Sequence, residues 1–194
     1  MTDEELVEKV KKGDADVYEK IIQKYQSKVF GLIYNMTKNQ NDIEDLAQEV
    51  FIKIYKNLGK FKGESSLYTW IYKITVNLCL DEMKKRKNVI YLDEKIEVDD
   101  GEVNRELPSE EKSQEKLYEE KELQEKLHNC INKLPEKQKV MIVLRDIKGF
   151  SYEEISKITD VKLGTVKSQI NRARLKLKEL LDEEGTFLEY IESN

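Results

Sequence analysis

The chain of 194 residues has few residues that interrupt helices, with eight Gly and two Pro. Charged residues make up 38% of it and hydrophobic residues 39%. This balance favours an all-α protein over a β-sandwich or a barrel. The length allows one large domain or two small ones.

Cysteine and histidine are also scarce. Cys79 and Cys130 lie far apart in helical, partly apolar patterns, so we expect two small buried thiols in a reducing cytosol rather than a disulfide. The single His128 is too little for a metal site or for a Ser/His/Asp set, and no glycine loop could cradle a phosphate. The sequence therefore predicts no catalytic residue, no metal, no cofactor and no enzyme activity.

Long apolar runs are absent as well. No stretch approaches the roughly 18 apolar residues that suggest a membrane span. The first ten residues, MTDEELVEKV, are acidic and unlike a signal peptide. We expect a cytoplasmic protein that does not insert into the membrane itself.

The net charge of −5 is unevenly distributed along the chain. Residues 1–92 hold 16 Lys and Arg against 14 Asp and Glu, whereas residues 93–126 hold 6 against 14. Residues 127–181 hold 12 against 6, and residues 182–194 hold five acids and no base. Positive potential is therefore concentrated in two blocks, and the local field governs attraction to phosphate.

The most informative segment is SYEEISKITDVKLGTVKSQINRARLKLK at residues 151–178. Ser151 and Glu154 form a capping-box pattern, which predicts a helix from Tyr152 with Ile155 and Ile158 buried. Asp160 suits the turn or left-handed position that follows, and Gly164-Thr165 opens a second helix. The pattern is typical of a helix–turn–helix, whose second helix enters the DNA major groove.

The second helix has one apolar and one polar side. Its apolar stripe consists of Val166, Ile170, Ala173, Leu177 and Leu180. Outside the stripe lie Lys167, Ser168, Gln169, Asn171, Arg172 and Arg174. A basic helical hairpin with a merely solvated outer face remains the alternative.

The N-terminal block is predicted to form four helices. They are a short helix Asp3–Lys12 ended by Gly13, a long helix capped by Asp14 or Asp16, a third helix that starts at Asn41 or Asp42, and a fourth helix capped by Ser65 or Ser66 that runs to Lys87. Helical periodicity returns firmly from Leu123, and Pro135 opens a helix buried through Val140, Val143, Leu144 and Ile147. Gly149 ends that helix, and Phe150 beyond it suits a C-cap contact.

The fourth helix carries a distinctive polar face. Leu67, Ile71, Ile74 and Leu78 form its expected buried stripe. Trp70, Lys73 and Asn77 then share an adjacent face. Such a trio can stack an unpaired base, hold a phosphate and hydrogen-bond a base edge, and the loop before the helix could receive an extruded base. The alternative is a core tryptophan with a solvated lysine beside it.

The third helix begins with an acidic cluster that comprises Asp42, Glu44, Asp45, Gln48 and Glu49. Part of this charge suits the positive end of the helix dipole. The excess would repel a phosphate backbone. We therefore expect a protein partner on this face and nucleic acid on the other.

These motifs resemble a known family, the extracytoplasmic-function (ECF) sigma factors. DIEDLAQEVFIKIYKNL at 42–58 and FKGESSLYTWIYKITVNLCLDEMKKRK at 61–87 resemble their domain two. LPEKQKVMIVLRDIKGFSYEEISKITDVKLGTVKSQINRARLKL at 134–177 resembles their domain four. The resemblance implies an all-α protein of two small helical domains joined by an acidic linker. It also implies a bacterial subunit that directs core RNA polymerase to promoters and is not an enzyme by itself.

The resemblance implies roles for particular residues. By this resemblance, Asp45, Gln48 and Glu49 would bind the clamp helices of the largest polymerase subunit. Recognition and capture of the melted minus-ten element falls on Lys62, Gly63, Glu64, Ser65, Ser66, Trp70, Lys73 and Asn77. Recognition of the duplex minus-thirty-five element falls on Lys167, Ser168, Asn171, Arg172 and Arg174.

Within the predicted recognition helix, we expect different contacts from different cations. Arg172 is the candidate for a bidentate base contact, which is worth roughly 1–3 kcal/mol of discrimination. Lys167, Arg174, Lys176 and Lys178 are expected to hold phosphates, which position the protein without reading sequence.

The implied domain organisation has four parts. Domain two spans 1–88, an acidic flexible linker spans 89–122, domain four spans 123–182, and an acidic tail spans 183–194. The linker either mimics nucleic acid inside polymerase channels or serves only as a spacer. No further domain is expected after residue 182.

The implied partners are core RNA polymerase, through its clamp helices and the flap of its second-largest subunit, promoter DNA in duplex and melted form, and a membrane-anchored anti-sigma factor. That factor could hold the protein at the membrane. The competing function is a helix–turn–helix regulator of duplex DNA with a helical sensor or dimerisation domain at its N-terminus.

Overall fold

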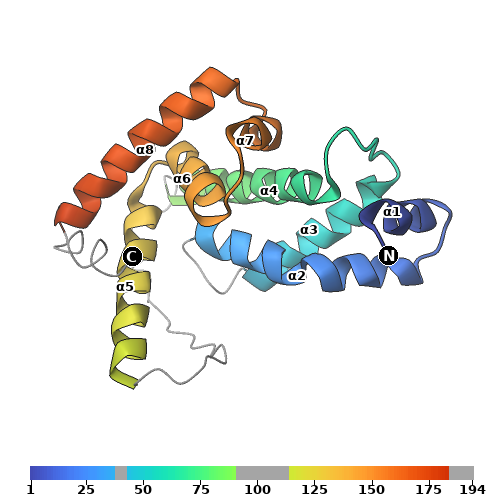
Figure 1. Cartoon of the computed structure of the whole chain (residues 1–194), viewed down its shortest axis with the longest axis horizontal. Helices are drawn as coiled ribbons and strands as arrows, with labels where there is room; N and C mark the ends of the chain where they lie inside the picture. The colour runs from blue at the N-terminus through green and yellow to red at the C-terminus, as the bar shows by residue number, and fades with distance from the viewer. Residues whose placement is uncertain (38–42, 91–113, 184–194) are drawn as a thin grey trace.

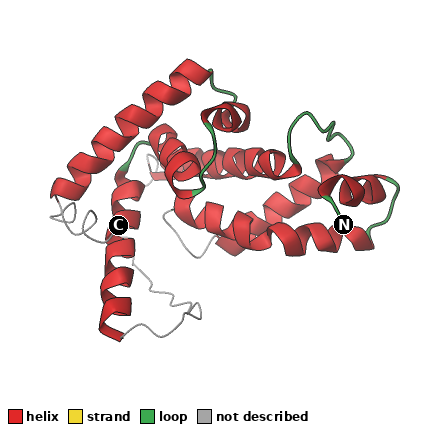
Figure 2. Ribbon diagram, viewed as in Figure 1, coloured by secondary structure: helices red, strands yellow, loops and turns green. Residues whose placement is uncertain are grey.

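The computed structural model describes residues 1–37, 43–90 and 114–183, and every regular element in these ranges is a helix (Figure 1, Figure 2). The prediction of an all-α fold is therefore confirmed. The elements are α1 (Asp3–Lys11), α2 (Asp16–Met36), α3 (Ile43–Leu58), α4 (Leu67–Ile90), α5 (Gln114–Lys133), α6 (Glu136–Ile142), the π-helical turn η2 (Val143–Ile147), α7 (Tyr152–Thr159) and α8 (Leu163–Glu183).

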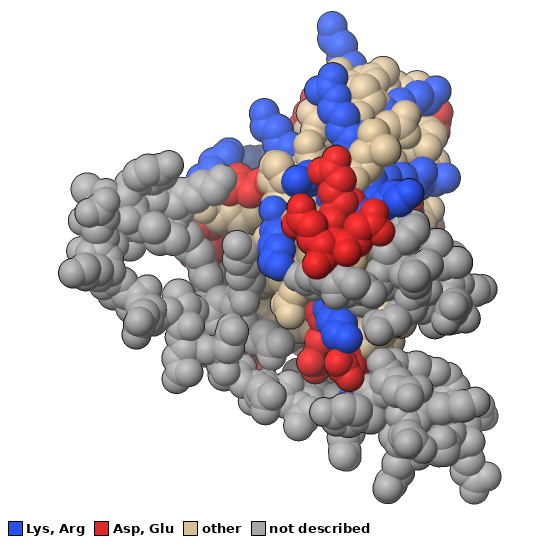
Figure 3. Space-filling view, turned by 90° about the vertical axis from the view of Figure 1, so that its left-hand side faces the viewer, with Lys and Arg blue, Asp and Glu red and all other residues tan. Residues whose placement is uncertain are grey.

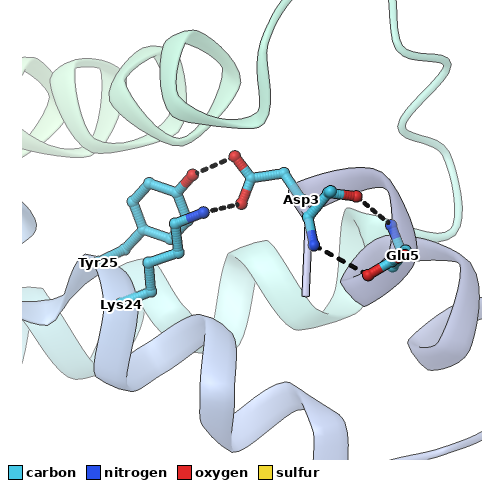
Figure 4. Close-up of polar contacts among 5 residues, drawn as sticks. Asp3, Glu5, Lys24 and Tyr25 are labelled. Carbon is cyan, nitrogen blue, oxygen red and sulfur yellow. Dashed lines mark hydrogen bonds and ion pairs between the residues drawn. The ribbon is translucent and has the colours of Figure 1, made fainter.

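Helices α1 to α4 form an N-terminal unit in which α2, α3 and α4 pack against one another. Its core contains side chains from all four helices, including Leu6, Ile21, Ile33, Ile54 and Ile71. Asp3 ties α1 to α2, because its carboxylate accepts a hydrogen bond from Tyr25 Oη at 2.7 Å and pairs with Lys24 Nζ at 2.7 Å (Figure 4). Burial and this contact raise the pKa of Tyr25, so the phenol stays a hydrogen-bond donor.

The helix boundaries follow the predicted capping pattern with one difference, at the start of α2. Ser66 caps α4, since its Oγ accepts a hydrogen bond from the Thr69 amide at 3.1 Å. At α2 the N-cap is Ala15, and Asp14 Oδ1 reaches the Val17 amide at 3.4 Å. The predicted start of the third helix at Asn41 or Asp42 lies outside the described residues.

Helices α5 to α8 form a C-terminal unit, in which α8 packs against α5, α6 and α7. Helix α5 begins at Gln114, within the range predicted as linker. The rest of that range from residue 91 onward, and the predicted tail from residue 184, lie outside the described residues.

The helix after Pro135 departs from the prediction in its second half. It widens into η2, where the Lys148 amide donates to the Val143 carbonyl five residues earlier. The wider turn shifts the side-chain directions. Ile147 is consequently exposed rather than buried, which corrects the expected stripe. Gly149 then ends the segment with a φ of +75°, as its predicted C-cap role requires.

The two units pack directly on each other, mainly through α4 and α7 (Figure 1). This contact explains why α4 is buried over more of its surface than the predicted stripe. Tyr72, Val76 and Cys79 are buried in addition, whereas Ile74 is only half-buried. Cys79 and Cys130 are both buried and form no disulfide, as predicted.

Candidate nucleic-acid and polymerase interfaces

The helix–turn–helix of the C-terminal unit has the predicted local geometry. Ser151 Oγ accepts a hydrogen bond from the Glu154 amide at 3.2 Å, and Glu154 Oε2 accepts one from the Ser151 amide at 2.9 Å. Asp160 ends α7 in the left-handed conformation with a φ of +55°. The capping box and the turn position of Asp160 are therefore confirmed, and α8 starts directly after the turn.

Helix α8 buries most of its predicted apolar stripe, although Leu177 and Leu180 are only half-buried, and exposes the predicted recognition residues. Val166, Ile170 and Ala173 are fully buried. The five predicted minus-thirty-five residues are all exposed: Lys167, Ser168, Asn171, Arg172 and Arg174. The helix thus offers a polar face that a DNA groove could receive.

The exposed cations of α8 differ in their surroundings. Arg174 Nε donates to Asp146 Oδ2 at 3.1 Å, and this carboxylate raises the pKa of the guanidinium. Lys167 Nζ lies 5.9 Å from the centre of the Tyr152 ring. Arg174 is therefore held in place by a carboxylate of its own chain. Arg172 is exposed on α8.

A cationic groove lies between α3 and α4 in the N-terminal unit. We call it the α3–α4 groove; its cavity volume is ≈480 Å³. Its lining includes Trp70, Lys73 and Asn77, so the structure brings the predicted trio of α4 together on one surface. Ile74 and Leu80 supply an apolar floor.

The groove also contains residues that the sequence analysis missed. Lys53 and Asn57 of α3 form its second wall, and Lys60 and Lys84 add two further cations. Lys53 and Asn57 lie four residues apart on α3, so their spacing in the sequence could have predicted that they share one helix face. The sequence could not predict that α3 and α4 face each other across a groove, because this arrangement depends on tertiary packing.

A second cavity, of ≈450 Å³, opens beside the loop that precedes α4. We call it the loop pocket. Of the predicted minus-ten residues, Lys62, Glu64, Ser65, Trp70 and Lys73 line it. Asn77 lines the α3–α4 groove instead. Gly63 and Ser66 shape the loop, the first with a φ of +75° and the second as the cap of α4.

Trp70 stands between the two cavities and lines both. Its ring centre lies 5.2 Å from that of Phe61 at an interplanar angle of 51°. Lys60 and Lys73 also line both cavities. An aromatic face flanked by two ammonium groups can stack a base and hold the adjoining phosphates.

The loop pocket has two further lining residues that come from the C-terminal unit. Lys157 of α7 and Asp160 reach it across the contact between the units. Asp160 Oδ1 pairs with Lys73 Nζ at 2.7 Å. A predicted DNA-binding cation is therefore paired with a carboxylate of the same chain.

The exposed face of α3 has the composition of a protein-binding surface. Asp45, Gln48 and Glu49 are all exposed at its start. Further along, Ile52 is 48% exposed and Tyr55 is 50% exposed. An apolar patch with a polar rim is the usual anatomy of a protein–protein interface.

Charged side chains of both signs lie close together on one face of the protein. On the face drawn in Figure 3, Lys and Arg side chains stand out along the upper part, and Asp and Glu side chains gather in a cluster beside them.

Within residues 1–37, 43–90 and 114–183, no group of three or more His, Cys, Asp or Glu could hold a metal ion. None of the helices searched in these ranges is both long enough and apolar enough to cross a membrane.

The chain matches two known protein families. Residues 21–89 match the family Sigma-70 region 2, and residues 124–177 match the family Sigma-70, region 4. The first match contains the lining of the α3–α4 groove and most of the lining of the loop pocket, and the second contains the helix–turn–helix. The two matched regions define a sigma factor of the sigma-70 type.

Similarity to individual relatives shows which group of sigma factors the chain belongs to. The chain is 38% identical to the ECF RNA polymerase sigma-E factor of Escherichia coli K12 over 90% of this chain and 91% of the relative. It is 35% identical to the ECF RNA polymerase sigma factor SigW of Bacillus subtilis over 90% of this chain and 94% of the relative. The chain therefore belongs to the ECF sigma factors, which are transcription-initiation subunits and not enzymes.

Solved structures share the fold of both units. The sigma factor RpoE of Bartonella quintana, in complex with the anti-sigma factor NepR, aligns with a TM-score of 0.67 at 22% identity, covering 85% of this chain and 96% of that one. CnrH, in complex with the cytosolic domain of CnrY, aligns with a TM-score of 0.63 at 18% identity, covering 92% and 96%.

Proposed function

We propose that this ECF sigma factor brings core RNA polymerase to promoters by reading DNA at two separate sites. Helix α8 reads the minus-thirty-five element as duplex, and the loop pocket with the α3–α4 groove takes the melted minus-ten strand. The observation that carries the proposal is the position of Trp70, Lys73 and Asn77 in the cationic α3–α4 groove of one unit, while α8 exposes Arg172 on the other.

The chemistry of the two sites differs, as this division of labour requires. Arg172 has the guanidinium fork that matches the O6 and N7 acceptors of guanine in the major groove. The cavities beside Trp70 instead combine an aromatic face with ammonium groups, which suits unpaired bases. Extrusion of a base from the duplex costs a few kcal/mol, and stacking in a shaped pocket offsets that cost. The N-terminal unit would thus trap an open state of the promoter that the duplex itself visits rarely.

The same groove explains how the strand could be held beyond the captured base. Lys53 and Lys84 lie along the groove on opposite walls. Their charge would track the phosphates on either side of the stacked base. Asp81 also lines the groove, so its charge would limit where the backbone can pass.

We further infer that α3 is the polymerase-binding helix. Asp45, Gln48 and Glu49 would contact the clamp helices of the largest subunit, and Ile52 and Tyr55 would extend the contact as its apolar centre. The acidic start of α3 is unsuited to DNA, so the face assigned to polymerase and the groove assigned to DNA do not compete. The C-terminal unit would contact the flap of the second-largest subunit.

Regulation by an anti-sigma factor is part of the proposal. Two proteins of similar fold are seen in complexes, the sigma factor RpoE with the anti-sigma factor NepR, and CnrH with the cytosolic domain of CnrY. For this chain we propose a membrane-anchored anti-sigma factor that holds an otherwise cytoplasmic protein. The acidic segment around residues 91–113 lies outside the described residues, and both of its predicted uses, as nucleic-acid mimic and as spacer, stay hypotheses.

The proposed function is tested by reconstituted transcription. Purified core polymerase is incubated with fragmented genomic DNA, with and without this protein, and the 5′ ends of the transcripts are sequenced. We expect protein-dependent start sites that share two upstream sequence elements. Protein-dependent binding to duplex fragments without any new start site would favour the competing function, a duplex-binding regulator.

Charge reversal on α3 gives a prediction for the polymerase contact. Glu49→Lys is expected to weaken binding to core polymerase about tenfold or more, since a like charge placed in an interface costs on the order of 1.4 kcal/mol or above. The measurement is the dissociation constant for core enzyme in the absence of DNA. Glu8→Lys, the same reversal on the exposed side of α1, serves as the control and should bind as the wild type does. Equal loss in both variants would contradict the assignment of α3.

A further inference from the structure

Helix α8 carries one exposed hydrophobic side chain that packing does not explain. Leu175 is 65% exposed, which is the highest exposed fraction among the large hydrophobic residues within 1–37, 43–90 and 114–183. It is also the one exposed large hydrophobic side chain on α8, a helix whose residues are all described. Because a single exposed leucine is common on protein surfaces, its neighbours must show whether it has a role.

Leu175 lies on the side of α8 that faces away from the core. Nine residues, or about 2.5 helical turns, separate it from the fully buried Val166, so the two side chains leave the helix in opposite directions. Leu175 is instead a neighbour of Asn171 and Arg172, four and three residues earlier on the helix. Ser168, seven residues earlier, lies on the same side. These three neighbours are exposed, and they are the residues that we propose to meet duplex DNA.

The charge around Leu175 favours DNA over a protein partner. Residues 167–178 contain no Asp or Glu, and they contain the exposed cations Lys167, Arg172, Arg174, Lys176 and Lys178. The centre of a protein interface is built from several apolar side chains, whereas α8 exposes a single one. One apolar side chain among cations suits DNA instead, because the cations can hold phosphates while the apolar group contacts the C5-methyl group of a thymine.

We propose that Leu175 is a specificity-determining residue of α8, whose side chain contacts the C5-methyl group of a thymine in the major groove of the minus-thirty-five duplex. This methyl group distinguishes thymine by an apolar contact rather than by a hydrogen bond. The proposal rests on the proposed function of α8 as the duplex reader and deepens it. Arg172 reads the hydrogen-bond acceptors of one base, and Leu175 reads a methyl group on another.

The position of Leu175 along α8 indicates which base pair it meets. Its rise from Arg172 is about 4.5 Å along the helix axis, since an α-helix rises about 1.5 Å per residue. Stacked base pairs are about 3.4 Å apart, so we expect the thymine within about two base pairs of the one that Arg172 reads. One turn further on, Glu179 is exposed and pairs with Lys176 at 3.0 Å. A carboxylate repels phosphates, so the reading face ends at Leu175.

The test begins with selection of bound sequences from a random duplex pool, by the full chain alone and by the full chain bound to core polymerase. Each thymine of the recovered sequence is then replaced in turn by deoxyuridine, which pairs with adenine in the same way but lacks the C5-methyl group. Dissociation constants for the thymine and deoxyuridine duplexes are measured with the wild type and with Leu175→Ala. Leu175→Met keeps a flexible apolar side chain and serves as the rescue variant.

We expect deoxyuridine at one position to weaken binding by the wild type about 3- to 5-fold, as removal of one methyl group from an apolar contact should. Leu175→Ala should lose about as much on the thymine duplex and should bind the two duplexes equally. Leu175→Met should keep most of the preference for thymine. Arg172→Ala should bind more weakly and still prefer thymine, because the two residues read different base pairs.

Ile147→Ala is the matched control for loss of an exposed apolar side chain. Ile147 is 39% exposed on η2 of the same unit, outside α8. This variant should bind both duplexes as the wild type does. Circular dichroism melting of every variant checks that both units remain folded, which we expect for Leu175→Ala because alanine is the most favourable residue in a helix.

Three results would overturn the proposal. The first is a wild type that recovers no duplex sequence or responds to no deoxyuridine substitution. The second is a thymine preference that Leu175→Ala keeps in full. The third is a loss of affinity for core polymerase in Leu175→Ala with unchanged duplex preference, which would assign Leu175 to a protein contact.

Reconstituted transcription with the wild type reports separately on the proposed function. If the wild type directs no initiation while Leu175 still determines the preference for thymine, the proposed function fails and the methyl contact stands. If the wild type initiates at promoters and Leu175→Ala keeps the preference, the methyl contact fails and the proposed function stands.

Discussion

Trp70→Ala is expected to weaken binding of the non-template strand by the polymerase complex about 5- to 150-fold, because a base–aromatic stack contributes roughly 1–3 kcal/mol. Trp70 is the one aromatic side chain that lines both the α3–α4 groove and the loop pocket. Lysines on either side can hold the phosphates, but they cannot replace the π-face that keeps a base out of the duplex. The variant should therefore bind promoters yet open them poorly.

The measurement for Trp70 is fluorescence anisotropy of a labelled non-template strand with the core–sigma complex, at a promoter mapped by reconstituted transcription. Trp70→Phe keeps an aromatic face and should lose far less. Unfolding curves must accompany the assay, since Trp70 also contacts Phe61. Should Trp70→Ala and Trp70→Phe behave alike, or should the loss follow stability alone, the stacking role would be wrong.

Arg172→Ala is expected to cost about 1–3 kcal/mol of binding to the cognate minus-thirty-five duplex, which is roughly a 5- to 150-fold loss, and to relax specificity at one base pair. The reason is its exposed position on α8, where no carboxylate of the described residues is seen to pair with it. Binding to unrelated duplex should change much less, because phosphate contacts dominate that affinity.

Arg174→Ala is the matched control for Arg172. Arg174 lies on the same helix and carries the same charge, but it hydrogen-bonds to Asp146. Its loss should weaken cognate and unrelated duplex by similar factors. The measurement is a competition titration over duplexes changed one base pair at a time. If Arg174→Ala relaxed specificity and Arg172→Ala did not, the assignment of the base contact to Arg172 would be contradicted.

Local signals in the sequence were sufficient for the helical elements and for much of each site. Periodicity placed Val166, Ile170 and Ala173 in the core, and the residue types at Ser151 and Glu154 predicted the capping box that the structure contains. These features depend on neighbours within one or two helical turns. The same spacing argument put Trp70, Lys73 and Asn77 on one face.

Features that depend on distant residues were not predictable in this way. The pair of Lys73 and Asp160 joins residues 87 positions apart, and no local pattern marks it. Burial of Tyr72 and Val76 on α4 likewise follows from packing of the C-terminal unit. The π-helical turn moved Ile147 to the surface, because one wider turn changes every later side-chain direction. The acidic linker and the tail lie outside the described residues, so their predicted uses stay predictions.

The division of DNA reading between the two units is tested most directly by photo-crosslinking in the complex with core polymerase and promoter. A crosslinking amino acid replaces Lys84 at the α3–α4 groove in one sample and the exposed Leu175 beside Arg172 in the other. We expect the first to label only the melted non-template strand of the minus-ten element, and the second to label only duplex at the minus-thirty-five element. Labelling of one and the same duplex segment from both positions would contradict the two-site account.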